Sequence, residues 1–233
     1  MAYIRVVLKI SGEAMGGTGR SGLDPDRITF IAKQIISAQA GGAELGLVVG
    51  GGNFLRGATL QGRIERVTAD QMGMLATVIN GMALRDSIRA LGGQAEVRSA
   101  VPVPGVVDRF RAEESRALLA AKTAVIFAGG TGNPFFTTDT ACALRCCEIE
   151  ADLMLKATKV DGVYSDDPLK NPSAERFDRL SYQDVLDRQL GVMDLTAVEL
   201  CRSKGIPILV FDFLREGNIV KAVKGESVGT LIA

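Results

Sequence analysis

The sequence predicts an α/β protein, a three-layer αβα sandwich built around a mainly parallel sheet. The first observation is that short, continuous apolar runs of strand length alternate with longer segments of helical periodicity. The second is that glycine-rich turns directly follow two of the apolar runs. The third is composition, because 47% hydrophobic residues and 27 glycines suit strands that are buried on both faces and joined by tight turns. The sequence shows neither a linker nor an internal repeat, so we expect a single domain over residues 1–233.

The first half of the chain is predicted to hold three strands and two long helices. The strands are expected at residues 3–10, 44–49 and 94–100. Asp24 as the N-cap and Pro25 at the first helical position begin the first helix, which ends at Gly41-Gly42. Residues 68–71, Thr-Ala-Asp-Gln, resemble a capping box, and they predict a second helix that runs to Leu91.

The second half continues this alternation. The expected helices cover residues 112–121 and 140–149, a short span from Ser181, and residues 194–205. The expected strands cover residues 123–128, 152–157 and 206–211, with an edge strand at 229–233. Residues 158–168 are predicted to be a polar, turn-rich segment. Helices that alternate with strands in this way are typical of parallel sheets with crossover connections.

Charge and histidine content exclude several classes of function. Lys plus Arg and Asp plus Glu both number 27 and no basic stripe is present, which argues against nucleic acid as the main partner. No apolar run reaches membrane-spanning length and no signal-peptide pattern precedes the first strand, so we expect a cytoplasmic protein. The chain has no histidine, which removes Ser-His and Cys-His nucleophiles and histidine-ligated metals.

The four cysteines do not predict a metal site. Cys142, Cys146 and Cys147 fall in one expected helix and Cys201 in another, without a second ligand pair at a suitable spacing. We interpret them as core thiols, and we expect no metal site built from protein ligands alone.

The longest glycine-rich turn runs from Gly129 to Asp139, between an expected strand and an expected helix. Glycines let the backbone approach a ligand closely, and the free N–H groups at a helix start attract an anion. The two phenylalanines and three threonines of this turn also suit a flat ring. An ordinary connection is the alternative interpretation, although the turn is longer than the roughly 2–6 residues that are usual for such a loop.

Two other strand ends carry groups suited to phosphate. Lys9 lies at the end of the first strand, beside a Ser-Gly turn, and open α/β sheets bind ligands beyond such strand ends. Residues 50–53, Gly-Gly-Gly-Asn, follow the second strand, and Arg56 comes one turn later, where it would clamp a phosphate. A surface lysine is the alternative for Lys9. Asp70, in the first turn of the long helix, either complements the helix dipole or accepts hydrogen bonds from a ribose.

Two other nucleotide-binding patterns do not apply. Residues 17–22 match the dinucleotide pattern G-x-G-x-x-G, but they lie several residues past the strand, and the helix begins only at Asp24-Pro25. We interpret them as a flexible hairpin. The P-loop pattern G-x-x-x-x-G-K-[ST] is absent from the sequence.

The two glycine turns and the strand-end lysine predict phosphoryl transfer between two phosphate-bearing molecules. This reaction depends on alignment and on neutralising the charge spread over the transferred group. An acceptor phosphate has a second pKa of about 6, so at neutral pH it is mostly dianionic and is a nucleophile without a histidine base. Mg²⁺ is implied with ATP, because it typically keeps several waters and binds few carboxylates.

Six segments in chain order resemble the bacterial uridylate kinases, which belong to the amino acid kinase family. They are residues 9–13, 50–53, 69–77, 130–139, 156–164 and 192–195. The run GTGNPFFTTD at residues 130–139 is specific to this branch, and the resemblance covers essentially the whole chain. It implies an αβα fold of about eight strands, transfer of the γ-phosphate of ATP to UMP to give UDP, and a homohexamer built as a trimer of dimers.

The resemblance also implies roles for particular residues. Lys9 would neutralise the transferring phosphoryl group, and Asp139 would orient Lys9 and help organise Mg²⁺. The residues implied for ATP are Lys9, Ile10, Ser11, Gly12, Gly52, Arg56, Thr158, Tyr164 and Asp167, of which the last three would line the adenosine site. The residues implied for UMP are Gly51, Arg56, Asp70, Thr131, Gly132, Asn133, Pro134, Phe135, Phe136, Thr137 and Thr138.

Within the UMP set, Gly51 and Arg56 would hold the phosphate and Asp70 the ribose hydroxyls. Residues 131–138 would contact the uracil, and polar groups left unpaired in that pocket would penalise cytosine. Lys159 and Asp194 match family positions without an assigned role.

One departure from the family pattern concerns regulation. Many members from Gram-negative bacteria carry an arginine, linked to activation by GTP, at the position that Glu96 occupies here. Arg98 lies two residues on, on the same face of the expected strand, and is the candidate substitute. The resemblance implies feedback inhibition by UTP and leaves activation by GTP open.

Three alternatives stay open at this point. A kinase acting on a carboxylate or carbamate would not need Asp70 or the long turn at residues 129–139. The molybdenum storage proteins resemble uridylate kinases, but their cluster sites include histidines, which this chain lacks. A regulatory contact with DNA gains no support from the balanced charge.

Overall fold

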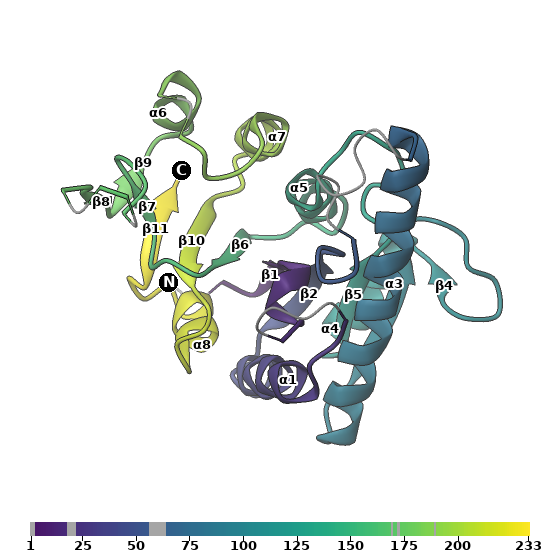
Figure 1. Ribbon diagram of the computed structural model, residues 1–233. Coiled ribbons are helices and arrows are strands. Elements are labelled where there is room, and N and C mark those ends of the chain that lie inside the picture. Colours follow the sequence, from purple (N-terminus) through teal and green to yellow (C-terminus); the bar gives the residue numbers. More distant parts are fainter. Residues whose placement is uncertain (1–2, 18–21, 56–63, 169, 172, 189) are drawn as a thin grey trace.

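The computed structural model describes residues 3–17, 22–55, 64–168, 170–171, 173–188 and 190–233. Within these residues a nine-stranded sheet forms the middle layer (Figure 1). From edge to edge its strands are β4 (Asp108–Arg109), β3 (Ala95–Ser99), β5 (Ala124–Ala128), β2 (Glu44–Val49), β1 (Arg5–Ile10), β6 (Leu153–Thr158), β10 (Ile208–Asp212), β11 (Gly229–Ile232) and β9 (Arg179–Leu180). Neighbouring strands are parallel except β10 and β11. Two short strands, β7 (Val163–Tyr164) and β8 (Arg176–Phe177), pair separately as an antiparallel ribbon.

Helices cover both faces of the sheet. One face carries α1 (Pro25–Ala40), α3 (Arg66–Ala90) and α8 (Asn218–Val223). The other carries α4 (Ala112–Ala120), α5 (Thr138–Glu148), α6 (Tyr182–Asp187) and α7 (Leu195–Lys204). Figure 1 shows α1 and α8 on the side of the sheet opposite to α5, α6 and α7. The predicted αβα sandwich with a mainly parallel sheet is therefore confirmed, with nine strands where about eight were expected.

The structure differs from the expectation at the margins of the sheet. Residues 229–233 do not form the edge, because β9 pairs with the outer side of β11. β4 and β9 have two residues each and were not predicted, since alternation cannot be recognised over so short a span. The six-residue helix α8 was missed for the same reason.

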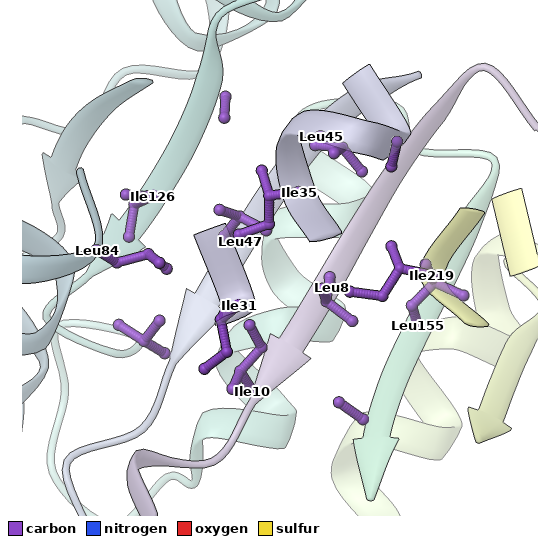
Figure 2. Close-up of a cluster of buried hydrophobic side chains, with 14 of the residues drawn as sticks. Leu8, Ile10, Ile31, Ile35, Leu45, Leu47, Leu84, Ile126, Leu155 and Ile219 are labelled. Atoms are coloured by element: carbon purple, nitrogen blue, oxygen red, sulfur yellow. The ribbon is translucent and has the colours of Figure 1, made fainter. Parts of the chain in front are cut away.

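The alternation of side chains along β1 joins the two layers of the core. Leu8 and Ile10 point into the cluster beneath α1, while Val7 points into the cluster beneath α5 and α7. Figure 2 shows Leu8 and Ile10 in the same cluster as Ile31 and Ile35 of α1. Each such burial contributes roughly 1.5–3 kcal/mol, which fixes β1 between β2 and β6.

Three of the predicted helix starts are confirmed. The side chain of Asp24 accepts hydrogen bonds from two backbone N–H groups in the first turn of α1. Ser181 and Asp194 are the N-caps of α6 and α7. Gly205, with φ of 65°, ends α7 in the left-handed conformation that favours glycine. Among the described residues, none of the helices has the apolar length that a bilayer crossing needs.

Two helix starts were predicted too late. The capping box expected at residues 68–71 is wrong, because α3 begins at Arg66, after Glu65. The hydroxyl of Thr68 instead donates to the carboxylate of Glu65 at 3.2 Å. α5 begins at Thr138 with Thr137 as its N-cap, so Asp139 lies inside the first turn. Of the hairpin expected at residues 17–22, residues 18–21 lie outside the described part of the chain.

Candidate active site

Two lysines and one aspartate meet at the carboxyl-terminal edge of the sheet. β1 and β6 are parallel neighbours, and Lys9 lies opposite Lys156 in their register. Asp139 contacts both lysines from the first turn of α5. The Nζ atom of Lys9 lies 2.9 Å from its Oδ1 atom, and Nζ of Lys156 donates a hydrogen bond to its Oδ2 atom. The three side chains are 10–13% exposed, so a nearly buried cluster with two cations and one anion faces the strand ends.

The charges in this cluster shift the pKa values of its members. Burial alone would raise the pKa of Asp139, but the positive charges of Lys9 and Lys156 hold this pKa below its usual value. Burial lowers the pKa of Lys156, and the carboxylate of Asp139 only partly offsets that effect. The carboxylate is therefore ionised at neutral pH. It neutralises one of the two ammonium charges and leaves the other available to an anion.

The two glycine turns beside the cluster pack against each other. A Cβ atom on Gly12 would lie 2.6 Å from the backbone nitrogen of Gly52 and 2.7 Å from the carbonyl oxygen of Gly50. A Cβ atom on Gly51 would lie 2.8 Å from the carbonyl oxygen of Gly73 in α3. These approaches exclude a side chain without backbone movement, so glycine is required for the turns to contact each other and α3.

A cavity of about 650 Å³ lies between the second glycine turn, α3 and the loop that follows β5. Its volume suits a ligand of nucleotide size. The predicted residues that line it are Gly51, Gly52, Asp70, Thr131, Asn133, Phe136, Thr137 and Thr138. The lining residues that sequence reasoning did not assign are Leu55, Ile64, Arg66, Ala69, Gly73, Met74, Thr77 and Gly130. On α3, the lining residues Arg66, Asp70, Gly73 and Thr77 follow helical spacing. This periodicity in the sequence could have identified the wall.

Some predicted residues lie elsewhere. Gly132 and Pro134 belong to the same loop but do not line the cavity. The side chain of Phe135 is 65% exposed, and its backbone has a φ of 72°, which is rare for a residue with a side chain. Its contribution is its backbone N–H group, which contacts Asp70. Arg56, predicted to clamp phosphate, lies outside the described residues.

Asp70 connects α3 to the loop that carries Phe135. Its carboxylate accepts hydrogen bonds from Nε of Arg66 at 2.9–3.0 Å and from the backbone N–H of Phe135 at 2.8 Å. Partial burial would raise the pKa of Asp70, but these two donors and the charge of Arg66 lower it overall. Asp70 is thus a fixed, ionised acceptor at the wall of the cavity.

The loop from Gly129 to Thr137 is anchored at both ends. At its start, the backbone N–H of Gly129 donates to the hydroxyl of Thr77 in α3 at 2.7 Å. At its end, the hydroxyls of Thr137 and Thr140 donate to the two carboxylate oxygens of Asp194. Asp194 also caps α7 by accepting from a backbone N–H at 2.8 Å. Asp194 therefore holds the cavity loop to α7, a role that its sequence position did not reveal.

The residues expected for adenosine lie past the end of β6. Thr158 is the last residue of that strand, Tyr164 lies in β7, and Asp167 follows in the next turn. These residues do not line the 650 Å³ cavity. Lys159 is next in sequence to Thr158, and its Nζ atom lies 3.4 Å from the carboxylate of Glu13, which comes directly after Gly12. The strand-end cluster thus has the cavity on one side and the expected adenosine residues on the other.

Comparison with known proteins defines the family. The sequence profile described as the amino acid kinase family matches residues 5–212. The chain belongs to the amino acid kinase family. It is 50% identical over 231 residues to the uridylate kinase of Pseudomonas syringae pv. syringae, covering 99% of this chain and 94% of that protein. It is also 50% identical over 233 residues to the uridylate kinase of Legionella pneumophila, covering 100% of this chain and 94% of that protein.

Solved structures of the family agree with this assignment. The UMP kinase from Bacillus anthracis has a TM-score of 0.97 at 36% identity, covering 100% of this chain and 96% of that chain. The UMP kinase from Ureaplasma parvum has a TM-score of 0.94 at 34% identity, with 100% of both chains covered. Within the amino acid kinase family, the similarity of this chain is therefore to uridylate kinases.

Glu96, at the position that the family links to activation by GTP, and Arg98, its candidate substitute, lie in β3. Glu96 forms an ion pair with Arg89 of α3 at 2.6 Å. The guanidinium of Arg98 lies 3.0 Å from the carboxylate of Asp108 and 3.9 Å from that of Glu96. Arg98 is thus engaged with carboxylates in this structure, so binding an anion there would require it to exchange partners.

The cysteines and carboxylates do not gather into a metal site within the described residues. Among the described residues of this amino acid kinase, no group of three or more His, Cys, Asp or Glu side chains could hold a metal ion. Cys142, Cys146 and Cys201 are buried between α5 and α7, and Cys147 is half-buried. Burial raises the pKa of the Cys201 thiol. The interpretation of these cysteines as core thiols is confirmed for the three buried ones.

Proposed function

We propose that this protein is a UMP kinase that transfers the γ-phosphate of ATP to UMP and releases ADP and UDP. The observation that carries the proposal is the Lys9–Asp139–Lys156 cluster, which lies at the strand ends beside two contacting glycine turns. The adjacent cavity is lined by an ionised carboxylate, Asp70, and by the loop after β5. The similarity to uridylate kinases over the whole chain supports the same activity.

The proposed chemistry is direct in-line transfer without a phosphoenzyme. An oxygen of the dianionic UMP phosphate attacks the γ-phosphorus, and the bond between that phosphorus and its bridging oxygen to the β-phosphate breaks. No side chain has to remove a proton, in agreement with the absence of histidine. Lys9 and Lys156 would neutralise charge on the transferred group, and Asp139 would hold their ammonium groups in place.

The residues present suit an Mg²⁺ ion that arrives with ATP. Mg²⁺ binds through one or two carboxylates and the substrate phosphates, and it keeps several waters. Asp139 supplies one carboxylate at the strand ends, and its Oδ1 atom meets Lys9 as an ion pair without the geometry of a hydrogen bond. When bound with ATP, the ion would supply positive charge that neutralises the phosphates. Asp139 would then serve both the lysines and the metal ion.

UMP would occupy the 650 Å³ cavity. Gly51 would face its phosphate. Gly52, which the resemblance implied for ATP, also lines this cavity and would lie near the same phosphate. Asp70 would accept hydrogen bonds from the ribose hydroxyls. The loop from Thr131 to Thr138 would contact the uracil, with polar groups that a cytosine would leave unpaired. Arg66 lies beside Asp70 on the same wall of the cavity. ATP would bind on the other side of the strand ends, near Ser11, Thr158, Tyr164 and Asp167.

The proposal includes assembly and regulation. We infer a homohexamer located in the cytoplasm, with feedback inhibition by UTP. Activation by GTP is a separate question, because Glu96 stands where an arginine is expected and Arg98 is paired with Asp108. Size-exclusion chromatography with light scattering measures the oligomer, and a mass other than that of six chains would contradict the hexamer.

The deciding experiment measures ADP release from ATP and Mg²⁺ with UMP, CMP, dTMP or acetylglutamate, with and without GTP or UTP. We expect activity with UMP, and kcat/KM for CMP lower by about 100-fold or more, because the pocket would leave its polar groups unpaired. Strong activity on acetylglutamate, or none on any nucleotide, would contradict the proposal. A phosphoprotein isolated after incubation with ATP alone would contradict direct transfer.

A further inference from the structure

Asn53, in the second glycine turn, and Asn80, in α3, form a reciprocal pair of side-chain amides. Nδ2 of Asn53 donates to Oδ1 of Asn80 at 2.9 Å, and Nδ2 of Asn80 donates to Oδ1 of Asn53 at 2.7 Å. Asn80 is fully buried and Asn53 is 6% exposed. Burying an amide destabilises the folded protein unless its polar atoms are hydrogen-bonded. The two side chains can satisfy each other in only one relative position, so the pair fixes where the two segments lie.

The remaining amide hydrogens bond to backbone carbonyls of two other segments. Nδ2 of Asn80 donates to the carbonyl of Gly50 at 2.6 Å. Nδ2 of Asn53 donates to the carbonyl of Gly22 at 2.8 Å, and the backbone N–H of Gly22 donates back to the carbonyl of Asn53 at 2.9 Å. All four N–H bonds of the two side chains are thus used, and the pair connects α3, the second glycine turn and the segment before α1.

The segments joined in this way are those that carry the two phosphate sites of the proposed reaction. Asn80 follows Asp70, Gly73 and Thr77 on the face of α3 that borders the cavity. On the other side, the Oδ1 atom of Asn53 lies where a Cβ atom on Gly12 would be only 2.6 Å away. The amide pair therefore lies between the wall of the acceptor cavity and the first glycine turn.

We propose that Asn53 and Asn80 are positioning residues that set the spacing between the two glycine turns and α3, and through it the alignment of donor and acceptor phosphates. This inference rests on the proposed phosphoryl transfer. In-line transfer is sensitive to this spacing, because a displacement of about 1 Å can lower a rate by about 100-fold. Neither side chain has to touch a substrate to act in this way.

The test compares the wild-type protein with Asn80→Ala, Asn80→Ser, Asn53→Ala and the double Asn53→Ala/Asn80→Ala variant. Serine is included because it keeps a polar group in the space and perturbs folding less. Each variant is assayed at saturating ATP and UMP, well below its own unfolding midpoint. We expect kcat to fall by about 10-fold or more, while KM for UMP and for ATP changes by less than about 3-fold.

Leu84→Ala is the matched control for a merely structural effect. Leu84 lies one turn after Asn80 in α3 and is fully buried in the core. We expect it to lower Tm as much as the asparagine changes do, with kcat within about 2-fold of the wild type. An equal loss of kcat in Leu84→Ala would overturn the inference, because it would show that any weakening of α3 has this effect.

The double variant tests whether the two amides act as a unit. We expect its kcat to be no lower than that of the worse single variant, because either change alone breaks the pair. If the kcat losses of the two single variants multiplied in the double variant, the pairing would be contradicted. If the single variants folded and had the kcat of an active wild type, the inference would be overturned while the proposed function stood. A wild-type protein inactive on UMP would instead overturn the proposed function, and the inference with it.

Discussion

The strand-end cluster and the cavity loop are neighbouring parts of the candidate site, but they are held in different ways. Lys9 and Lys156 stand on adjacent parallel strands, and their side chains and that of Asp139 are 10–13% exposed. In the loop, Phe135 and Phe136 are 65% and 52% exposed, and hydrogen bonds at the two ends anchor the backbone. The cluster thus has its geometry and charge set by the core, whereas much of the loop surface remains available to a ligand.

This difference predicts different consequences of mutation. A substitution in the cluster leaves an unpaired charge with little access to solvent, so both the free energy of unfolding and kcat should fall. A change at the cavity wall removes a contact that only a bound ligand completes, so KM should change most. The substitutions below test this division.

The largest effect on stability is expected from Asp139→Asn. The isosteric amide removes the carboxylate that pairs with Lys9 and Lys156, and it leaves two neighbouring cations with little solvent. Breaking a buried ion pair in this way costs about 3–5 kcal/mol in the free energy of unfolding. Urea unfolding at pH 7 measures it.

Asp178→Asn is the control for Asp139→Asn. Asp178 pairs with Arg176, but its side chain is 82% exposed, so the free energy of unfolding should hardly change. If Asp139→Asn were as stable as this control, the cluster would not depend on charge compensation, and the contrast between cluster and loop would lose its basis.

The largest effect on catalysis is expected from Lys9→Met. Methionine keeps much of the side-chain volume but removes the ammonium group that would stabilise the transferred phosphoryl group. Loss of one such electrostatic contact lowers kcat by about 100- to 1,000-fold, and KM for UMP should change little. Steady-state kinetics with Lys33→Met, an exposed position on α1, as the control measures both constants. Equal changes in kcat and KM would instead indicate that Lys9 only binds.

The cluster also shows how far local sequence patterns predicted the site. Lys9 and the glycine turns were predictable, because parallel strands place their carboxyl ends at one edge of the sheet. Lys156 was missed as a member of the cluster although it lies in a correctly expected strand. Its place opposite Lys9 depends on β6 pairing with β1, which are neighbours in the sheet but not in sequence.

The loop also shows that contacts distant in sequence could not be predicted from local patterns. Its extent and its glycines were visible in sequence, but its anchors were not. Thr77, which bonds to Gly129, and Asp194, which bonds to Thr137 and Thr140, are each more than fifty residues from those partners. Such contacts follow from the packing of α3 and α7, and no local signal specifies them. The fold class, by contrast, needs only the alternation of elements, and it was predicted correctly.

A smaller effect, confined to substrate binding, is expected from Asp70→Asn. The amide keeps the shape but removes the charge that accepts hydrogen bonds from Arg66, from the backbone of Phe135 and, in our proposal, from a ribose. Loss of one charge-assisted hydrogen bond, about 1.5 kcal/mol, corresponds to a rise of about 10-fold in KM for UMP. The value of kcat should change less.

Asp86→Asn is the matched control on the same helix. Asp86 pairs with Arg85, its side chain is 68% exposed, and it does not line the cavity. Its KM for UMP should equal that of the wild type. An unchanged KM in Asp70→Asn as well would remove Asp70 from the binding site and would weaken the assignment of the cavity to UMP.

The smallest effect is a pH dependence of stability that belongs to the cluster alone. Burial lowers the pKa of Lys156 below its usual 10.5, so between that lowered value and 10.5 the folded protein holds fewer protons at Lys156 than the unfolded chain does. The free energy of unfolding should therefore rise with pH in this window, by at most about 1.4 kcal/mol per pH unit, and level off above 10.5. Burial also raises the pKa of the Cys201 thiol, which makes the free energy of unfolding depend on pH through a second group. The measured quantity is therefore the difference between the wild type and Lys156→Met, in which that contribution cancels. If the difference in the free energy of unfolding stayed constant or fell as pH increased toward 10.5, Lys156 would not be desolvated. The cluster would then be solvated like the exposed loop and not like the core.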